Sequence, residues 1–312
     1  MTTAFVLSGG GSLGAVQVGM LQALAAHGVE PDLLVGTSAG AMNAAWVAAH
    51  GTSADSLSAL AGVWIRLRRR DVFPVRVRTA LRGLLGLGPA VTSPDRLREL
   101  VAACAGIDLV EEARIPVHLV AADLLSGLTV TVSGGSLVDG VLASAAIPGV
   151  FPPVLRDGRL LVDGGVAHHT GVSRAVELGA TDIYVLPTGA PCALPAAPRS
   201  ALGTALHALT LLIEQRTAAE MAHLAGTASI KLLPPLCPLR TSAMDFGHAA
   251  ELIDRSRKAS MSWIDRGDID LPGPEAFLAA HRHRSSVVGQ STRSESASRI
   301  SSRPQMNSSP KS

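Results

Sequence analysis

Short apolar segments alternate with helical segments along the first 190 residues, and glycine-rich turns separate many of them. Residues 5–7 precede a helical pattern over 12–28, and residues 33–36 precede another over 39–51. Apolar strands separated by helices are typical of a largely parallel sheet that helices cover on both faces. The pattern therefore predicts an α/β protein.

The later part of the chain continues the alternation. Asp157-Gly158 stands between apolar residues and is expected to turn a hairpin. The further predicted elements are strands at 115–123, 128–133, 159–163, 182–189 and 229–233, and helices at 172–180, 201–225 and 248–265.

The composition changes at the C-terminal end. In the segment 284–312, 11 of 29 residues are serine and no apolar periodicity remains, which is typical of disorder. The preceding residues are numerous and apolar enough to bury a sizeable core, since 47% of the chain is hydrophobic. We expect one domain over 1–283 and a Ser-rich disordered tail over 284–312.

Charge and cysteine content narrow the classes of function. A net charge of +2 gives no argument for nucleic acid or a strongly acidic partner. Cys104, Cys192 and Cys237 lie far apart in the sequence, so neither a disulfide framework nor a metal site is expected. No apolar run reaches the ~18 residues of a membrane span, and the N-terminus lacks a signal-peptide pattern. A reducing, cytoplasmic location is the simplest inference.

The glycines after the first strand admit two interpretations. Gly9, Gly11 and Gly14 fit G-x-G-x-x-G, as in a dinucleotide-binding turn. Such a site needs an acidic residue at the carboxyl end of the second strand, but Glu30 and Asp32 come before that strand. A P-loop also lacks support because no Lys-Ser/Thr pair follows the glycines. The other interpretation is an oxyanion hole.

Gly36-Thr37-Ser38-Ala39-Gly40 matches G-x-S-x-G directly between a predicted strand and a helix. In such an elbow the serine takes a strained conformation, and Gly36 and Gly40 let the backbones pass closely. The Ser38 hydroxyl would then project near the positive end of a helix. Ser38 is the candidate nucleophile, and a plain N-cap serine is the structural alternative.

The first and second strands should be neighbours, so that the loops at their carboxyl ends meet. The amides of Gly10, Gly11 and Ser12 are then candidate donors to an oxyanion that forms when Ser38 attacks a carbonyl carbon. A glycine turn that only permits close strand–helix packing is the alternative.

A serine nucleophile needs a base, and Asp163 ends a predicted strand just before Gly164-Gly165. An aspartate with the ordinary pKa of about 3.9 is a poor base at neutral pH. Desolvation, or a tight bond to the serine hydroxyl, must therefore assist it. An aspartate that only caps a turn is the alternative.

Four motifs occur together in this chain: SGGGSLGAVQVGML, VGTSAGAMNA, ASAAIPGVFPPV and VDGGV. In this order and context the chain resembles the patatin-like phospholipases over most of residues 4–190. The resemblance implies a three-layer α/β/α fold related to the α/β hydrolases, with Ser38 as nucleophile, Asp163 as base and Gly9–Gly14 as the oxyanion loop. It implies hydrolysis of phospholipid, lysophospholipid or neutral-lipid esters through an acyl-enzyme, with no cofactor.

Two departures from the family pattern affect this expectation. Leu13 stands where a basic residue is usual, and His168-His169 stand where an Asn-rich segment is usual. A weakened or inactive protein that binds lipids or partners is therefore the alternative function. One histidine could assist Asp163 in a triad. A metal site lacks further ligands at suitable spacing.

Arg66–Arg82 carries seven arginines and one aspartate, with apolar residues between them. Such a segment could contact an anionic membrane surface or form a lid. Phe73-Pro74 argues against one continuous amphipathic helix, and a solvated charged face is the alternative.

Overall fold

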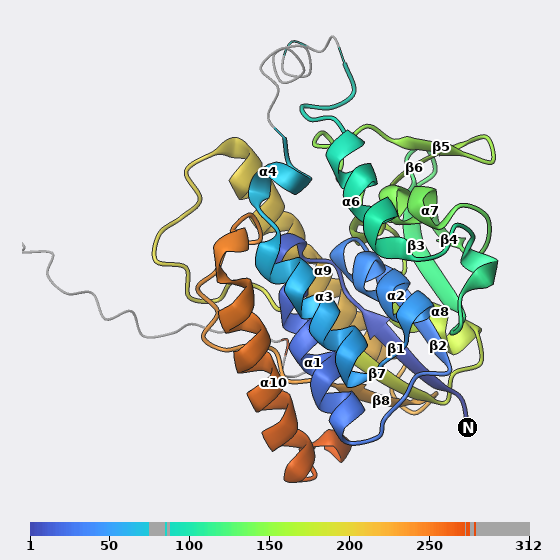
Figure 1. The fold of residues 1–312 in the computed structure, drawn as a ribbon, viewed down its shortest axis with the longest axis vertical. Helices are drawn as coiled ribbons and strands as arrows, with labels where there is room; N and C mark the ends of the chain where they lie inside the picture. Colours follow the sequence, from blue (N-terminus) through green and yellow to red (C-terminus); the bar gives the residue numbers. More distant parts are fainter. Residues whose placement is uncertain (75–84, 86–87, 272, 275–277, 279–312) are drawn as a thin grey trace, which may run out of the picture. The chain divides into compact units, whose positions relative to one another are not determined.

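The computed structural model describes residues 1–74, 85, 88–271, 273–274 and 278. These residues contain an eight-stranded sheet in the order β5-β6-β3-β2-β1-β7-β8, with β4 also paired to β3 (Figure 1). The strands are β1 (Thr3–Leu7), β2 (Leu33–Thr37), β3 (Val117–Asp123), β4 (Thr129–Val132), β5 (Val154–Arg156), β6 (Arg159–Asp163), β7 (Asp182–Leu186) and β8 (Ser229–Leu232).

The sheet is mixed. The neighbouring strands β3, β2, β1, β7 and β8 run parallel, whereas β4 and β6 pair antiparallel with β3 and β5 pairs antiparallel with β6. Between β5 and β6, Asp157 and Gly158 both adopt positive φ angles, 49° and 74°. Such angles are those of a tight hairpin turn, so the prediction of a hairpin at Asp157-Gly158 is confirmed.

Helices cover both faces of the sheet, which confirms the predicted α/β fold. They are α1 (Gly14–Ala26), α2 (Ala39–His50), α3 (Ala54–Arg66), α4 (Arg69–Val72), α6 (Asp95–Ala105), α7 (Leu137–Ser144), α8 (Gly171–Glu177), α9 (Ala201–His223) and α10 (Ala249–Asp265). Single 3-10 turns lie at Gly11–Leu13, Val110–Glu112, Gly164–Val166, Phe246–His248 and Asp268–Asp270.

Side chains of the central strand β1 alternate between two buried cores because successive residues of a strand point to opposite faces. Phe5 and Leu7 belong to the core that α1, α2, α3 and α10 cover. Ala4 and Val6 belong to the core on the other face, which residues of α8 and α9 complete (Figure 1). Buried on both faces, β1 contains no charged residue.

The described residues as far as 278 belong to one compact unit, Met1–Arg282. The predicted disordered tail, 284–312, lies outside the described residues, and so does most of the second half of Arg66–Arg82. In the part of the chain that is described, no helix combines the length and the apolar character that crossing a bilayer requires.

Candidate active site

The register of three strands brings Ser38 and Asp163 together. Thr37 at the end of β2 pairs with Val120 of β3, and Asp163 at the end of β6 pairs with Ala121 of β3. Ser38 and Asp163 therefore lie at the same level on the two sides of β3. The Ser38 Oγ lies 2.6 Å from the Asp163 Oδ2, and the hydroxyl donates a hydrogen bond to the carboxylate.

Ser38 occupies the sharp turn between β2 and α2. Its φ of 55° and ψ of −120° are unusual for a residue with a side chain. Such strain is typical of a functional turn that the surrounding structure holds in place. The Ser38 hydroxyl makes no cap hydrogen bond to α2, so the interpretation of Ser38 as a plain N-cap is wrong.

The two glycines of the elbow are required by close backbone contacts. A Cβ on Gly40 would overlap the Leu7 carbonyl, and a Cβ on Gly36 would lie 2.7 Å from the Ala41 Cα. Any larger residue would push α2 away from the ends of β1 and β2. Both glycines therefore permit the turn that projects Ser38.

Ser144, the last residue of α7, is hydrogen-bonded to the turn that contains Ser38. The Ser38 N–H donates to the Ser144 Oγ at 2.9 Å, and the Ser144 hydroxyl donates to the Val120 carbonyl at 2.6 Å. Ser144 is fully buried. It therefore ties the backbone of the strained residue to β3, a role that the sequence did not reveal.

Asp163 is 1% exposed, and Ser38 is 6% exposed. The second carboxylate oxygen of Asp163, Oδ1, accepts the Gly165 N–H at 2.7 Å. Burial raises the pKa of Asp163 from 3.8 to about 6, while the hydrogen bonds from Ser38 and Gly165 oppose this rise. A carboxylate with such a pKa is still ionised at neutral pH but is a better proton acceptor than an ordinary aspartate.

The glycine loop after β1 runs beside Ser38. A Cβ on Gly9 would lie 3.1 Å from the Ser38 Cβ. The Thr188 hydroxyl, which follows β7, donates to the Gly9 carbonyl at 2.7 Å and leaves no space for a side chain on Gly10. Gly11 has a φ of 59° and passes so close to Ala243 that a Cβ would lie 2.5 Å from its carbonyl oxygen.

Two of the predicted loop amides are already occupied. The Ser12 N–H donates to the Ala243 carbonyl at 2.9 Å, and the Gly14 N–H bonds to carbonyls of the preceding turn. We therefore correct the set of candidate donors by removing Ser12 and Gly14. The amides of Gly10 and Gly11 make no hydrogen bond to the described part of the chain.

A buried polar network lies under this loop. The Gln17 side-chain amide donates to the carbonyl of Ser8, just after β1, and to the carbonyl of Leu186, the last residue of β7. These two strands are neighbours in the sheet. The Asn43 amide donates to Gln17 Oε1 at 2.8 Å, and the Trp64 indole N–H donates to Asn43 Oδ1 at 2.8 Å. Since each of these polar groups has a partner, the network fixes α1, α2 and α3 relative to the strand ends.

Two hollows meet at Ser38. One also includes Asp163, Gly10 and the α9 residues Thr210 and Ile213. The other has an apolar lining apart from Gly11 and Ser38. Its other lining residues are Ala39, Met42, Trp64, Leu67, Val72, Phe73, Leu97, Ala145, Ile147, Phe151 and Phe246.

Leu13, the first departure from the family pattern, is fully buried in the core next to α1. It therefore brings no charge to the loop. Among the described residues that line the two hollows, Asp163 is the one charged side chain.

His168 and His169 take no part in the hydrogen bond between Ser38 and Asp163. The His169 Nδ1 lies 3.4 Å from a carboxylate oxygen of Glu220, and the His168 and His169 rings contact each other at 4.4 Å between centroids. Among the described hydrogen bonds, neither ring reaches Ser38 or Asp163. The described residues also contain no group of side chains arranged to hold a metal ion.

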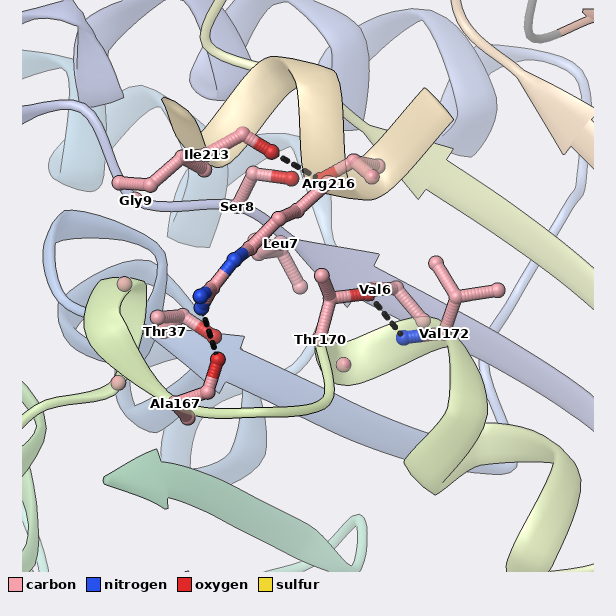
Figure 2. A pocket seen from close by; sticks show the side chains of 14 residues that line it. Val6, Leu7, Ser8, Gly9, Thr37, Ala167, Thr170, Val172, Ile213 and Arg216 are labelled. Carbon is pink, nitrogen blue, oxygen red and sulfur yellow. Dashed lines mark hydrogen bonds between the residues drawn. The ribbon is translucent and has the colours of Figure 1, made fainter. Parts of the chain in front are cut away.

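Helix α9 fastens the segment that follows Asp163. Figure 2 shows the Arg216 guanidinium reaching the Ala167 carbonyl, to which it donates a hydrogen bond. The Thr170 N–H and hydroxyl both donate to Glu220 of the same helix. These contacts hold the backbone beyond Asp163 without the asparagines that are usual in the family pattern.

The first part of the basic segment Arg66–Arg82 contributes to the site through its apolar residues. Val72 and Phe73 are buried and line the apolar hollow. The Phe73 ring stacks on Phe151 at 5.6 Å between centroids and meets Phe246 edge-on at 6.2 Å. Arg69 and Arg70, between these residues and α3, are exposed.

Comparison with known proteins gives partial matches. The chain is 34% identical over 163 residues to an uncharacterized NTE family protein of Mycobacterium tuberculosis, which covers 52% of the chain and 42% of that protein. It is 28% identical over 191 residues to patatin-like phospholipase domain-containing protein 7 of Mus musculus, with 60% of the chain and 13% of that protein covered. The chain thus spans less than half the length of these relatives.

Two solved structures resemble this protein at low sequence identity. VipD from Legionella pneumophila matches with a TM-score of 0.42 and 16% identity over 85% of the chain and 67% of VipD. Human GIVD cytosolic phospholipase A2, solved in complex with methyl gamma-linolenyl fluorophosphonate, matches with a TM-score of 0.42 and 13% identity. That match covers 89% of the chain and 59% of the human protein.

The family match includes Ser38 and Asp163 and the six strands from β1 to β6, and it ends before β7 and β8. The model of the family described as patatin-like phospholipase matches residues 5–176, which is more than half of the chain. The protein belongs to the patatin-like phospholipase family.

Proposed function

We propose that this protein is a serine acyl hydrolase that cleaves carboxylic esters of lipids through a Ser38–Asp163 dyad. The observation that carries the proposal is the 2.6 Å hydrogen bond from the Ser38 Oγ to a buried carboxylate whose pKa is about 6. A nucleophile that hydrogen-bonds to its base at the edge of an apolar hollow is the arrangement that acyl transfer to serine requires.

In the proposed reaction, the Ser38 Oγ attacks the carbonyl carbon of the ester while its proton passes to the Asp163 Oδ2. The oxyanion of the tetrahedral intermediate accepts hydrogen bonds from the Gly10 and Gly11 amides, which have no other partner among the described residues. Asp163 then returns the proton to the leaving alcohol or lysolipid, and an acyl-enzyme remains. Water then attacks this ester while one of its protons passes to Asp163, and Asp163 returns that proton to the Ser38 Oγ as the fatty acid leaves.

The shape and polarity of the site favour a lipid substrate. The apolar hollow lies beside Ser38, and its lining is almost entirely hydrophobic, as is typical of small-molecule sites. An acyl chain that lies along Phe73, Phe151 and Phe246 would leave its ester carbon near Ser38. The hollow that contains Asp163 and α9 would then take the leaving group.

Hydrolysis of p-nitrophenyl esters, and labelling by a fluorophosphonate probe, test the proposal. Ser38→Ala is expected to abolish labelling, and Asp163→Asn to lower kcat by about 10³-fold, within the range that general bases contribute. Ser58→Ala on an exposed part of α3 and Asp157→Asn in the hairpin are matched controls that should keep wild-type rates. Full activity in Ser38→Ala or Asp163→Asn would remove that residue from the reaction.

The probe also distinguishes an active hydrolase from the alternative, an inactive protein that binds lipids or partners. An activated Ser38 labels covalently, whereas an inert serine at the same position does not. Contact of Arg66–Arg82 with an anionic membrane stays a prediction, as does the cytoplasmic location. Flotation with vesicles that contain phosphatidylserine tests the membrane contact, because binding should fall as salt screens the arginines.

A further inference from the structure

Two cysteines that lie 45 residues apart in the sequence meet in the fold. Cys192 follows β7 and Cys237 follows β8, and these two strands are parallel neighbours. The loops that leave them therefore start from the same edge of the sheet, and the Cys192 side chain lies close enough to Cys237 to raise the pKa of its thiol. This contact was not expected from the sequence, because the spacing of the cysteines gives no local signal.

Backbone contacts hold the two loops side by side at this point. The Leu239 N–H donates to the Cys192 Sγ at 3.3 Å, and the Ala193 N–H donates to the Leu239 carbonyl at 3.0 Å. These bonds join Cys192 and Ala193 to Leu239, which lies two residues after Cys237, so the backbones of the two loops run close together there. A disulfide requires such a prior approach of the two backbones.

The thiols are also within reach of a small oxidant. Cys237 is exposed and Cys192 is half-buried, whereas the third cysteine, Cys104, is half-buried on α6. Exposure and a neighbouring second cysteine are two of the features of redox-sensitive thiols.

Both loops lead into the walls of the candidate active site. The segment after Cys237 reaches Ser242 and Ala243, whose carbonyls accept the Ser12 hydroxyl and N–H. The segment after Cys192 leads into α9, whose Thr210 and Ile213 line the hollow with the dyad. A bond between the cysteines would therefore join the two segments that border the glycine loop and the dyad.

We propose that Cys192 and Cys237 form a reversible disulfide, a redox-sensitive modification site that ties the loop before α9 to the loop after β8. With oxidised glutathione as oxidant, the Cys237 thiolate attacks one glutathione sulfur and releases one glutathione thiolate. The Cys192 sulfur loses its proton to solvent and attacks the Cys237 sulfur of this mixed disulfide, releasing the second glutathione thiolate. Two protein thiols are oxidised and one glutathione disulfide is reduced to two thiols.

The rate of this reaction should depend on pH. Burial raises the pKa of the Cys237 thiol, and the neighbouring Cys192 raises it further. Because the thiolate is the attacking species, disulfide formation should be slow near neutral pH and accelerate as the pH rises.

The test uses the full chain and glutathione buffers of defined ratio. After equilibration, acid quenching and alkylation of the denatured protein, we expect one alkylated cysteine, Cys104, and a non-reduced peptide map that joins Cys192 to Cys237. Dithiothreitol should restore all three thiols. The urea midpoint of the oxidised protein should rise, because the cross-link restrains the unfolded chain.

Matched variants separate this pair from general oxidation. Cys192→Ser and Cys237→Ser should each lose the oxidant-dependent shift of the urea midpoint, whereas Cys104→Ser should keep it. Three alkylated thiols in an excess of oxidised glutathione would overturn the proposal. So would a stable Cys237–glutathione adduct without the intramolecular bond, or a disulfide between two chains. The peptide map of the wild-type protein gives a decision even where a variant does not fold.

Discussion

The polar and the apolar sides of Ser38 are built in different ways. On the polar side, Asp163, Ser144 and the glycine loop are held by hydrogen bonds to backbone groups. On the apolar side, rings such as Phe73 and Phe151 contact one another through side chains alone. Hydrogen bonds have strict geometry, whereas apolar contacts tolerate changes of shape at constant volume. The polar side should therefore govern the rate of bond cleavage, and the apolar side the choice of substrate.

Apart from Ser38 and Asp163 themselves, the largest loss of kcat is expected at the glycine loop. Gly10→Ala places a methyl group against Thr188 and displaces an oxyanion donor, so kcat on a short-chain ester should fall about 10²- to 10³-fold. The matched control is Gly28→Ala, where φ is 70° but no atom lies within reach of the new Cβ. It should lower stability without lowering kcat. Equal losses of kcat in both variants would mean that the loop acts only through folding.

A smaller effect on rate is expected at Ser144. Ser144→Ala removes the acceptor of the Ser38 N–H and leaves a buried donor unpaired, which costs about 1–3 kcal/mol of unfolding free energy. Since the elbow then loses its tie to β3, kcat should fall about 10-fold while KM stays close to the wild-type value. Steady-state kinetics and urea unfolding measure the two effects. A loss of stability with an unchanged kcat would show that Ser144 does not position the nucleophile.

The pH dependence of stability reports on Asp163 separately from catalysis. Its folded pKa of about 6 lies above the unfolded value of 3.8. The resulting contribution to stability is fully present below pH 3.8 and is lost as the pH rises through about 6. Relative to wild type, Asp163→Asn should thus gain about 2 kcal/mol of unfolding free energy between pH 4 and pH 7. Urea unfolding at several pH values measures this difference, and parallel curves for the two proteins would contradict it.

The smallest effect on cleavage itself is expected on the apolar side. Phe73→Ala enlarges the hollow and should cost about 3–5 kcal/mol of unfolding free energy. On a short-chain ester kcat should stay within a few-fold, while the preference between medium and long acyl chains shifts. Phe73→Leu keeps most of the side-chain volume and should bring both the unfolding free energy and the chain-length preference back towards the wild-type values. A loss of kcat on every chain length alike would remove the distinction between the two sides.

Much of the polar side could be predicted from the sequence because its residues follow strands. Ser38 and the glycine loop stand at the carboxyl ends of the parallel neighbours β2 and β1, and such ends meet by geometry. Asp163 was expected beside them, but it arrives on the antiparallel strand β6, so its place depends on register with β3.

The contacts that sequence reasoning missed are those between residues far apart in the chain. The Ser12 N–H donates to the carbonyl of Ala243, a residue more than 200 positions away, and no local pattern near Ser12 predicts that acceptor. Ser144 and the Cys192–Cys237 contact depend in the same way on tertiary packing. The aromatic wall around Phe73 also combines separate segments. Local patterns carry no signal for such pairings.

The most direct measurement of the central claim is the rate at which a fluorophosphonate labels Ser38 as the pH is varied. If Asp163 accepts the Ser38 proton, the rate rises with an apparent pKa near 6, reaches a plateau above it and is strongly reduced at every pH in Asp163→Asn. Labelling that is independent of pH, or equally fast in Asp163→Asn, would contradict the account.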